Sequence, residues 1–457
     1  MRFMLLAAGL VASLVATTAN ADTRFEATLA GHAMLPAATF IAPPEGAPPG
    51  LARSGRFTGA GNIRMEAPGS IPGSTGPAPN GRATGLSLPF NGQPVQGFSG
   101  IAPVRGEAGA YWVLTDNGFG NRRNSSDAML MFHKLRPDFR TGSVAREQTV
   151  FISDPNRVLP FVIVNENSVS RFLTGGDLDL ESIQPVADGF WFGDEFGPYL
   201  IKTDSEGRVQ CVIATRIDGQ EIRSPDNHAL QPPASPAATV AFQSQRSGGY
   251  EGMAQSPDGS RLYAMLEKPL FNAEGRPEGR FIRIVEFDLT RGEWSGRVLR
   301  YRFEQQGTAI GDFNMIDDRR ALVIERDDGE GEPSLACAPG STPPGCFATP
   351  ARFKRVYLVD LGATDAEGFV SKIGHIDLME IRDPNRIART QGDRGPAVPV
   401  DRFSFPFFTI ENVHVVDADH IIVANDNNLP FSAGRSLARA DDNEFILLRV
   451  PELLRAR

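Results

Sequence analysis

Acidic residues recur close together at the ends of several strand-like segments of this chain. The pattern is clearest at residues 179–198 (DLESIQPVADGFWFGDEFGP), 250–269 (YEGMAQSPDGSRLYAMLEKP) and 409–428 (TIENVHVVDADHIIVANDNN). Residues 97–118 and 309–328 carry looser copies of it. Clustered carboxylates repel one another unless a cation or hydrogen-bond donors compensate them. The recurrence therefore predicts a cation site, with solvated acids at strand ends as the simpler alternative.

The candidate ligands all offer oxygen atoms. Calcium takes six to eight oxygens with loose geometry, whereas zinc prefers Cys or His. The six histidines show no ligand spacing, and neither HExxH nor DxDxDG occurs. We therefore expect calcium in a site assembled from separate segments. The expected ligands are Asp116, Asp179, Glu181, Asp194, Glu195, Glu251, Glu267, Asp312, Glu325, Asp327, Glu411 and Asp426.

Basic residues lie beside several of these acids and could hold an anionic substrate while a metal activates water. Lys268 directly follows Glu267, and Arg326 lies between two acids. For each cation the alternative is a structural ion pair. Neither a GxSxG nor an SxxK motif is present, which argues against a covalent mechanism. The expected catalytic residues are Glu251, Glu267, Lys268 and Arg326, and the expected substrate-binding residues are Arg122, Lys202, Lys268 and Arg326.

Antiparallel hairpins are the elements that would position these acids. Each copy has two apolar runs around a turn, such as Asp188-Gly189 or Asp258-Gly259, which is typical of a hairpin. Opposed residues in a hairpin have a nearly constant sum of positions, so Glu251 is expected beside Glu267. In all five hairpins the polar pair then lies at the end away from the turn.

The order of the segments predicts an all-β fold of the β-propeller class. Strand-like runs follow the hairpins, for example at 128–139 and 281–303, and no long amphipathic helix occurs. Five hairpins are visible, and a sixth blade is expected from the N-terminal segment. The run at 444–451 is expected to pair with an N-terminal strand and close the ring. The tetrapeptide DPNR, at 154–157 and 383–386, indicates one connection used twice.

The first 21 residues have the pattern of a secretory signal: a basic residue, a short apolar run and a small-residue cleavage site. The apolar run is too short to span a bilayer. We expect an exported protein, periplasmic or extracellular, with no transmembrane segment. The formal net charge of −9 argues against a nucleic-acid partner.

Residues 22–457 are expected to form a single domain. Its Pro/Gly-rich stretches at 43–56 and 66–85 read as surface loops, and 216–248 and 327–352 as insertions between strands. Three cysteines are present. Cys337 and Cys346 bracket a short loop and could form a disulfide in an oxidising compartment, whereas Cys211 lies in an apolar stretch and is expected to be a buried free thiol.

Several short motifs of the chain form a recognisable set: SGI at 99–101, LTDNG at 114–118, DLESI at 179–183, GDEFGPYL at 193–200, IRSPDNHAL at 222–230, YEGMA at 250–254, LEKPL at 266–270 and ENV at 411–413. Together they resemble the bacterial phytase-like family, described as having esterase-like activity of phytase. The resemblance covers most of residues 97–450. It implies a secreted β-propeller and a calcium-dependent phosphoesterase.

Three functions remain open from the sequence. The first is a calcium-dependent phosphoesterase acting on a small-molecule ester, which the neighbouring Lys and Arg residues favour. The second is a propeller lactonase or arylesterase with one central calcium. The third is a non-catalytic propeller in which the ion is structural and the inserted loops bind a ligand.

Overall fold

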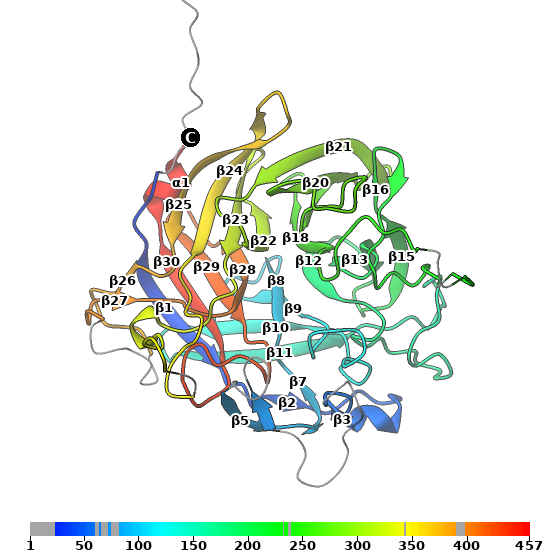
Figure 1. Ribbon diagram of the computed structural model, residues 1–457, viewed down its shortest axis with the longest axis horizontal. Helices are drawn as coiled ribbons and strands as arrows, with labels where there is room; N and C mark the ends of the chain where they lie inside the picture. The colour runs from blue at the N-terminus through cyan, green and yellow to red at the C-terminus, as the bar shows by residue number, and fades with distance from the viewer. Residues whose placement is uncertain are drawn as a thin grey trace, which may run out of the picture.

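The computed structural model describes residues 23–59, 64, 72–74, 82–231, 233–235, 239–341, 344–389 and 398–457. The proposed signal at residues 1–21 and part of the loop at 66–85 lie outside these residues. The described chain is almost entirely β-strand (Figure 1). Its α-helix is the short C-terminal α1 (Pro451–Arg455), and two 3-10 turns lie at Pro49–Ala52 and Pro333–Leu335. No helix in the described part of the chain is both long and apolar enough to cross a membrane.

Five groups of four antiparallel strands make up most of the structure. Four of them are consecutive in the chain, and the fifth takes its last strand from the N-terminus. From the inner to the outer strand, the groups are β8 (Phe98–Pro103), β9 (Tyr111–Thr115), β10 (Met131–Asp138) and β11 (Ser143–Phe151); β12 (Leu180–Val186), β13 (Gly189–Asp194), β14 (Tyr199–Thr203) and β15 (Val209–Ala214); β18 (Tyr250–Gln255), β19 (Arg261–Leu266), β20 (Phe281–Asp288) and β21 (Glu293–Arg302); β22 (Ala309–Met315), β23 (Arg320–Arg326), β24 (Lys354–Thr364) and β25 (Val370–Asp377); and β28 (Thr409–Val415), β29 (His420–Asp426), β30 (Asn443–Arg449) and β1 (Thr28–Leu35).

The inner strands of these groups surround a common centre. Strands β8, β12, β18, β22 and β28 contact one another in turn, and β28 contacts β8 to complete the circle (Figure 1). The two ends of the chain meet where β1 pairs antiparallel with β30. This pairing confirms the expected closure by the run at 444–451. Strand β1 also makes one parallel pairing with β11, so the first and last groups join into one larger sheet.

The remaining strands are short and lie outside the five groups. They pair as β2 (Phe40–Ile41) with β7 (Gln93–Pro94), β3 (Arg53–Ser54) with β6 (Phe90–Asn91), β4 (Pro72–Ser74) with β5 (Ala83–Ser87), β16 (Arg216–Ile217) with β17 (Gln220–Glu221), and β26 (Ile381–Arg382) with β27 (Arg402–Phe403). Among the described residues, the N-terminal strands form no four-stranded sheet of their own. The expected sixth blade is therefore not confirmed.

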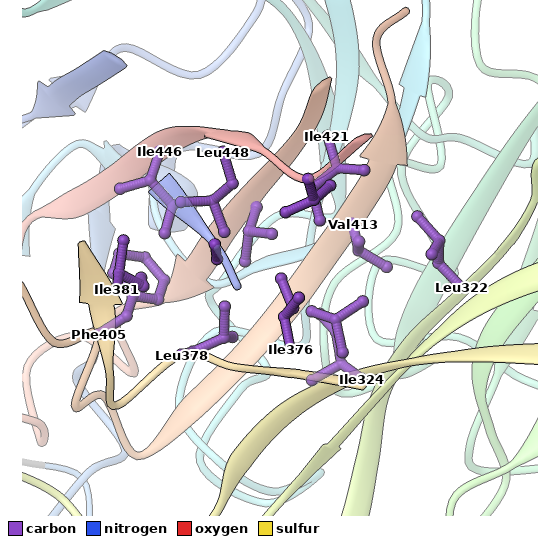
Figure 2. Packing of buried hydrophobic residues seen from close by; sticks show 14 of the residues in the cluster. Leu322, Ile324, Ile376, Leu378, Ile381, Phe405, Val413, Ile421, Ile446 and Leu448 are labelled. Carbon is purple, nitrogen blue, oxygen red and sulfur yellow. The ribbon is translucent and has the colours of Figure 1, made fainter. Parts of the chain in front are cut away.

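Apolar side chains fill the space between neighbouring groups. Figure 2 shows one such interface, where Leu322 and Ile324 of β23 pack against Val413 of β28 and Leu448 of β30. The alternate residues Ala321 and Val323 belong to the next cluster, because successive side chains of a strand point to opposite faces. Each inner hairpin is thus held from both sides, and its open end has a fixed direction.

The repeated tetrapeptide DPNR forms the same turn at both of its positions. The side chain of Asp154 accepts hydrogen bonds from the backbone N–H groups of Val158 and Leu159, and that of Asp383 accepts the equivalent two. Arg157 and Arg386 both have φ of 55°. The sequence repeat therefore marks a structural repeat. In the 327–352 insertion a disulfide joins Cys337 to Cys346, and Cys211 is a half-buried free thiol.

Candidate metal centre

A β-bulge near the start of each inner strand determines where the acids point. The pairing of β12 with β13 shifts between Leu180 and Ser182, so Glu181 has no direct partner. Glu251 and Glu411 occupy the same unpaired position in β18 and β28. Bulges of this kind re-aim a side chain. In β22 the unpaired residue is Gly311, and in β8 the bulge spans Ser99 and Gly100.

The second strand of each hairpin adds one more inward-facing residue at its end. Because side chains alternate along a strand, in four of the five hairpins this residue shares a face with an apolar residue two positions earlier that packs against the next group. Leu114 and Met265 show this for Asp116 and Glu267. The five equivalent residues are Asp116, Glu195, Glu267, Arg326 and Asp426.

Together these positions form what we call the acidic ring, with Asp179 added from the residue that precedes β12. All of its carboxylates are buried except Asp116, which is partly exposed, and two cations accompany them. Four acids come from the ends of the second strands, one from the segment before β12 and three from the bulges of the inner strands. Together they oppose only two positive charges. The acidic ring consists of Asp116, Asp179, Glu181, Glu195, Glu251, Glu267, Glu411 and Asp426, with Lys268 and Arg326.

Burial and mutual repulsion raise the pKa values of several acids of this ring, among them Asp116, Glu195 and Glu251. Burial raises the pKa of Glu181 well above its usual range, and the charges of Asp179 and Glu251 raise it further. For Glu411 burial and Asp426 raise the pKa to about 8, while Arg326 and the Ser99 hydroxyl oppose the shift. Such shifts mark a site where added positive charge is favourable.

Three carboxylates on one side of the ring are arranged as a cation site requires. One oxygen from each of Asp179, Glu181 and Glu195 lies within 4.8 Å of the other two. Asp179 Oδ1, Glu195 Oε1 and the neighbouring Glu251 Oε1 are buried without a hydrogen-bond partner, which is rare for carboxylate oxygens unless something else binds them. We call Asp179, Glu181 and Glu195 the acidic triad. Their oxygens fit calcium, which takes only oxygen ligands at 2.3–2.6 Å and completes its shell with water.

The two cations of the ring are held by protein groups. Arg326 Nη2 lies 3.5 Å from Glu267 Oε1 and 3.4 Å from Glu411 Oε1, and Nη1 lies 2.8 Å from Asp328 Oδ1. Lys268 Nζ lies 2.9 Å from Glu267 Oε2 and donates hydrogen bonds to the carbonyl oxygens of Ser247 and Arg246. An ammonium has three protons to donate. All three of the Lys268 acceptors are thus supplied by the protein.

Four of the expected ligands lie outside the ring. Asp194 accepts hydrogen bonds from the N–H groups of Asp179 and Gly197, and Asp312 accepts those of Val413 and Phe313. These two carboxylates bind backbone N–H groups and do not face the centre of the acidic ring.

Glu325 and Asp327 are the other two. Glu325 lies on the opposite face of β23 from Arg326, where it accepts hydrogen bonds from Tyr301 Oη and Lys372 Nζ. Asp327 lies 3.0 Å from Lys354 Nζ and accepts hydrogen bonds from three backbone N–H groups. Strand alternation separates Glu325 from the ring, and Asp327 lies beyond the end of the strand.

Two of the expected substrate-binding residues are also engaged elsewhere. Lys202 pairs with Asp188 at 2.6 Å, at the hairpin turn and therefore at the other end of the strands from the ring. Arg122 donates to the carbonyl oxygens of Gly176 and Asp226 and lies 2.7 Å from His228 Nδ1. Lys202 does not fit a role in substrate binding at the ring, and Arg122 connects loops.

The insertion at 216–248 is fastened to the backbone on both sides of the triad. Ser224 Oγ donates to the carbonyl of Phe196, and Asn227 Nδ2 donates to that of Gly197, directly after Glu195. His228 Nε2 contacts the carbonyl of Asp177 at 2.7 Å, two residues before Asp179. The motif IRSPDNHAL therefore belongs to the surroundings of the metal centre.

Some contributors to the site could not be assigned from single copies of the repeat. Ser99 Oγ of β8, in the first group of strands, donates a 2.8 Å hydrogen bond to Glu411 Oε2 of β28, in the last group. Phe408 packs its ring near the Arg326 guanidinium. Aligning the five inner strands, FSGI, LESI, YEGM, IGDF and IENV, would have revealed the shared bulge position, which is the signal that single hairpins lack.

Comparison with known families agrees with this architecture. A model of the phytase-like family, described as "Esterase-like activity of phytase", matches residues 93–429. The match includes the five inner hairpins and every residue of the acidic ring. The chain belongs to the phytase-like family.

Individual relatives are distant. An "Uncharacterized secreted protein" of Arthroderma benhamiae is 31% identical over 139 residues, which span 28% of this chain and 26% of that protein. Similar solved structures include a luciferin-regenerating enzyme (11% identity, 77% of each chain, TM-score 0.32). A 6-phosphogluconolactonase described as putative, from Bacteroides fragilis, gives 11% identity, 78% of this chain and 86% of that chain, with a TM-score of 0.30. Scores this low do not define the fold, which follows from the strand pairing.

Proposed function

We propose that this protein is a calcium-dependent hydrolase of ester bonds whose ion is held by the acidic triad. The observation that supports this most is the set of buried triad oxygens without hydrogen-bond partners. When bound, calcium supplies Lewis acidity toward an ester oxygen and toward water. Asp179, Glu181 and Glu195 hold the ion.

Glu251 is the residue we assign to proton transfer. It lies in the bulge of the neighbouring inner strand, and its Oε1 has no hydrogen-bond partner in the described structure. A carboxylate beside the ion can accept a proton from the attacking water. Glu267 is held by Lys268 and Arg326, so it positions those cations, and Lys268 fixes the end of the 216–248 insertion to the ring.

The charge of the ring favours a neutral ester as substrate, such as a lactone or an aryl ester. Arg326 and Lys268 already pair with protein carboxylates, and only the Nε of Arg326 is left as a buried donor without a hydrogen-bond partner among the described residues. The remaining carboxylates repel an anion at short range. A phosphoester remains the second candidate, favoured by the family's description.

We also infer a ring of five blades and an exported protein. The blade number is supported by the closed sequence of contacts among β8, β12, β18, β22 and β28. Export is supported by the secreted relative and by the Cys337–Cys346 disulfide, a bond typical of oxidising compartments.

A substrate panel tests the proposal. Purified protein, stripped with EGTA and then resupplied with calcium, would be assayed on lactones, aryl esters and phosphomonoesters. We expect calcium-dependent turnover of a neutral ester and its loss in Glu251→Gln, which keeps the shape of the side chain. Turnover of phosphomonoesters alone would favour the second candidate. Calcium binding without turnover of any member would indicate a structural ion, and activity unchanged by chelation would contradict metal dependence.

A further inference from the structure

The fourth group of strands, β22 to β25, is the fourth blade of the proposed ring. It departs from the pattern of the other four blades at the acidic ring. At the second-strand position, β9, β13, β19 and β29 supply or precede Asp116, Glu195, Glu267 and Asp426, whereas β23 supplies Arg326. At the bulge position of the same blade stands Gly311. This blade therefore brings a positive charge to the ring and no carboxylate.

Packing explains why no acid can replace Gly311. A Cβ atom there would lie 1.9 Å from the carbonyl oxygen of Ile410 and 3.3 Å from Glu411 Cγ. The close approach of β22 to β28 thus leaves no room for a side chain. The space at the centre beside Glu411 is filled from the second strand instead, by the long side chain of Arg326.

The guanidinium of Arg326 lies within the ring and not at its rim. Only 6% of its side chain is exposed, and Nη2 is shared between Glu267 from the third blade and Glu411 from the fifth. The fixed cation therefore compensates the acids of one half of the ring. The triad, which lies in the other half, includes buried oxygens that no protein donor reaches.

We propose that Arg326 is a built-in counter-cation that takes the place of a second metal ion, so that the ring binds one exchangeable calcium ion at the triad. This inference rests on the cation site of the proposed function and adds the number of ions and the reason for it. Removing the positive charge leaves Glu251 and Glu411 without a cation, and leaves Glu267 with Lys268 alone. Such a group of carboxylates offers calcium a second site.

Calcium stoichiometry tests the inference directly. The full-length protein, stripped of metal, would be titrated with calcium by calorimetry, and the number of bound ions would be counted by native mass spectrometry. We expect one ion for the wild type, one for Arg326→Lys, which keeps the charge, and two for Arg326→Met. The matched control is Arg320→Met, which removes another buried arginine of β23 that pairs with Asp317 near the turn, and it should still bind one ion.

Two results would overturn the inference: two or more exchangeable ions in the wild type, or no additional ion in Arg326→Met. If Arg326→Met does not fold, the wild-type count still decides, because a second exchangeable ion there leaves no role for a built-in cation. The outcome is separable from the hydrolase proposal. The expected ion counts without turnover of any ester would reject the hydrolase and keep this role for Arg326.

Discussion

Replacing Glu181 by Gln should stabilise the calcium-free protein, and calcium should reduce or reverse that gain. The substitution keeps the size of the side chain and removes one charge from the triad, whose oxygens lie within 4.8 Å of one another. At this distance and an effective dielectric constant of about 20, two carboxylates repel by about 3 kcal/mol. Proton uptake relieves part of that repulsion, because burial and Asp179 raise the pKa of Glu181.

The calcium-free variant should therefore be more stable than the calcium-free wild type, by about 1–2 kcal/mol after allowance for the bound proton. With calcium at about one hundred times its dissociation constant, the wild type gains about 2.7 kcal/mol. The variant has lost one charged ligand, so we expect at least tenfold weaker binding, which reduces that gain by about 1.4 kcal/mol. The difference between the two proteins then shrinks or reverses when calcium is added.

Thermal melts followed by circular dichroism, in EGTA and in calcium, would measure how calcium changes the stability difference between the two proteins. Asp312→Asn is the matched control, since Asp312 is a buried carboxylate that binds backbone N–H groups outside the ring. Its effect on the melting temperature should be the same in both conditions. A Glu181→Gln variant that is destabilised equally with and without calcium would refute the assignment of Glu181 to a cation site.

Two further predictions concern packing and pH. Gly311→Ala should destabilise the fold by several kcal/mol, measured by urea unfolding, because its Cβ would lie 1.9 Å from the Ile410 carbonyl oxygen; an unchanged midpoint would contradict the close approach of β22 and β28. Burial opposes ionisation of Glu444, but Arg435 and His32 outweigh it and lower its pKa to about 2, below the usual 4.5. Ionised Glu444 thus contributes about 3 kcal/mol of folding stability above pH 4.5, and this contribution is lost as the pH falls toward 2. The stability of Glu444→Gln, measured by unfolding, should therefore depend less steeply on acid pH than that of the wild type.

Much of the architecture could be predicted from the sequence because it depends on local patterns. The five hairpins have turn residues and strand-length apolar runs, so their existence and their open ends follow from short segments. The pairing of residues 444–451 with an N-terminal strand followed from the need to close a propeller ring. The sixth blade was expected by analogy with the repeat and is not confirmed, since β1 instead completes the group of β28, β29 and β30.

The site could be predicted only in part, because the sequence pattern does not show where a β-bulge shifts the register or which face of a strand each residue occupies. Glu325 and Arg326 are adjacent in the sequence, yet they face different clusters on the two sides of β23. Asp312 stands one residue beyond the bulge position that Gly311 occupies, and this shift turns it toward the backbone of Val413. Which acid of a pair reaches the centre thus depends on register, which each bulge changes by one residue.

The partners of the cations were also beyond the reach of the sequence. Lys268 and Arg326 were expected to hold substrate because they adjoin acids. Besides the nearby Glu267 and Asp328, their acceptors lie in distant segments, namely Ser247 in the insertion and Glu411 in the last group of strands. Contacts across such separations depend on the assembled ring and leave no local signature.

The central claim is that the triad binds a cation, and anomalous diffraction tests it most directly. Crystals grown with manganese or soaked in a lanthanide, both substitutes for calcium, would be measured at the absorption edge of the metal. The account predicts one strong anomalous peak among the carboxylate oxygens of Asp179, Glu181 and Glu195. The absence of a peak at the triad, with a peak elsewhere or none at all, would contradict it.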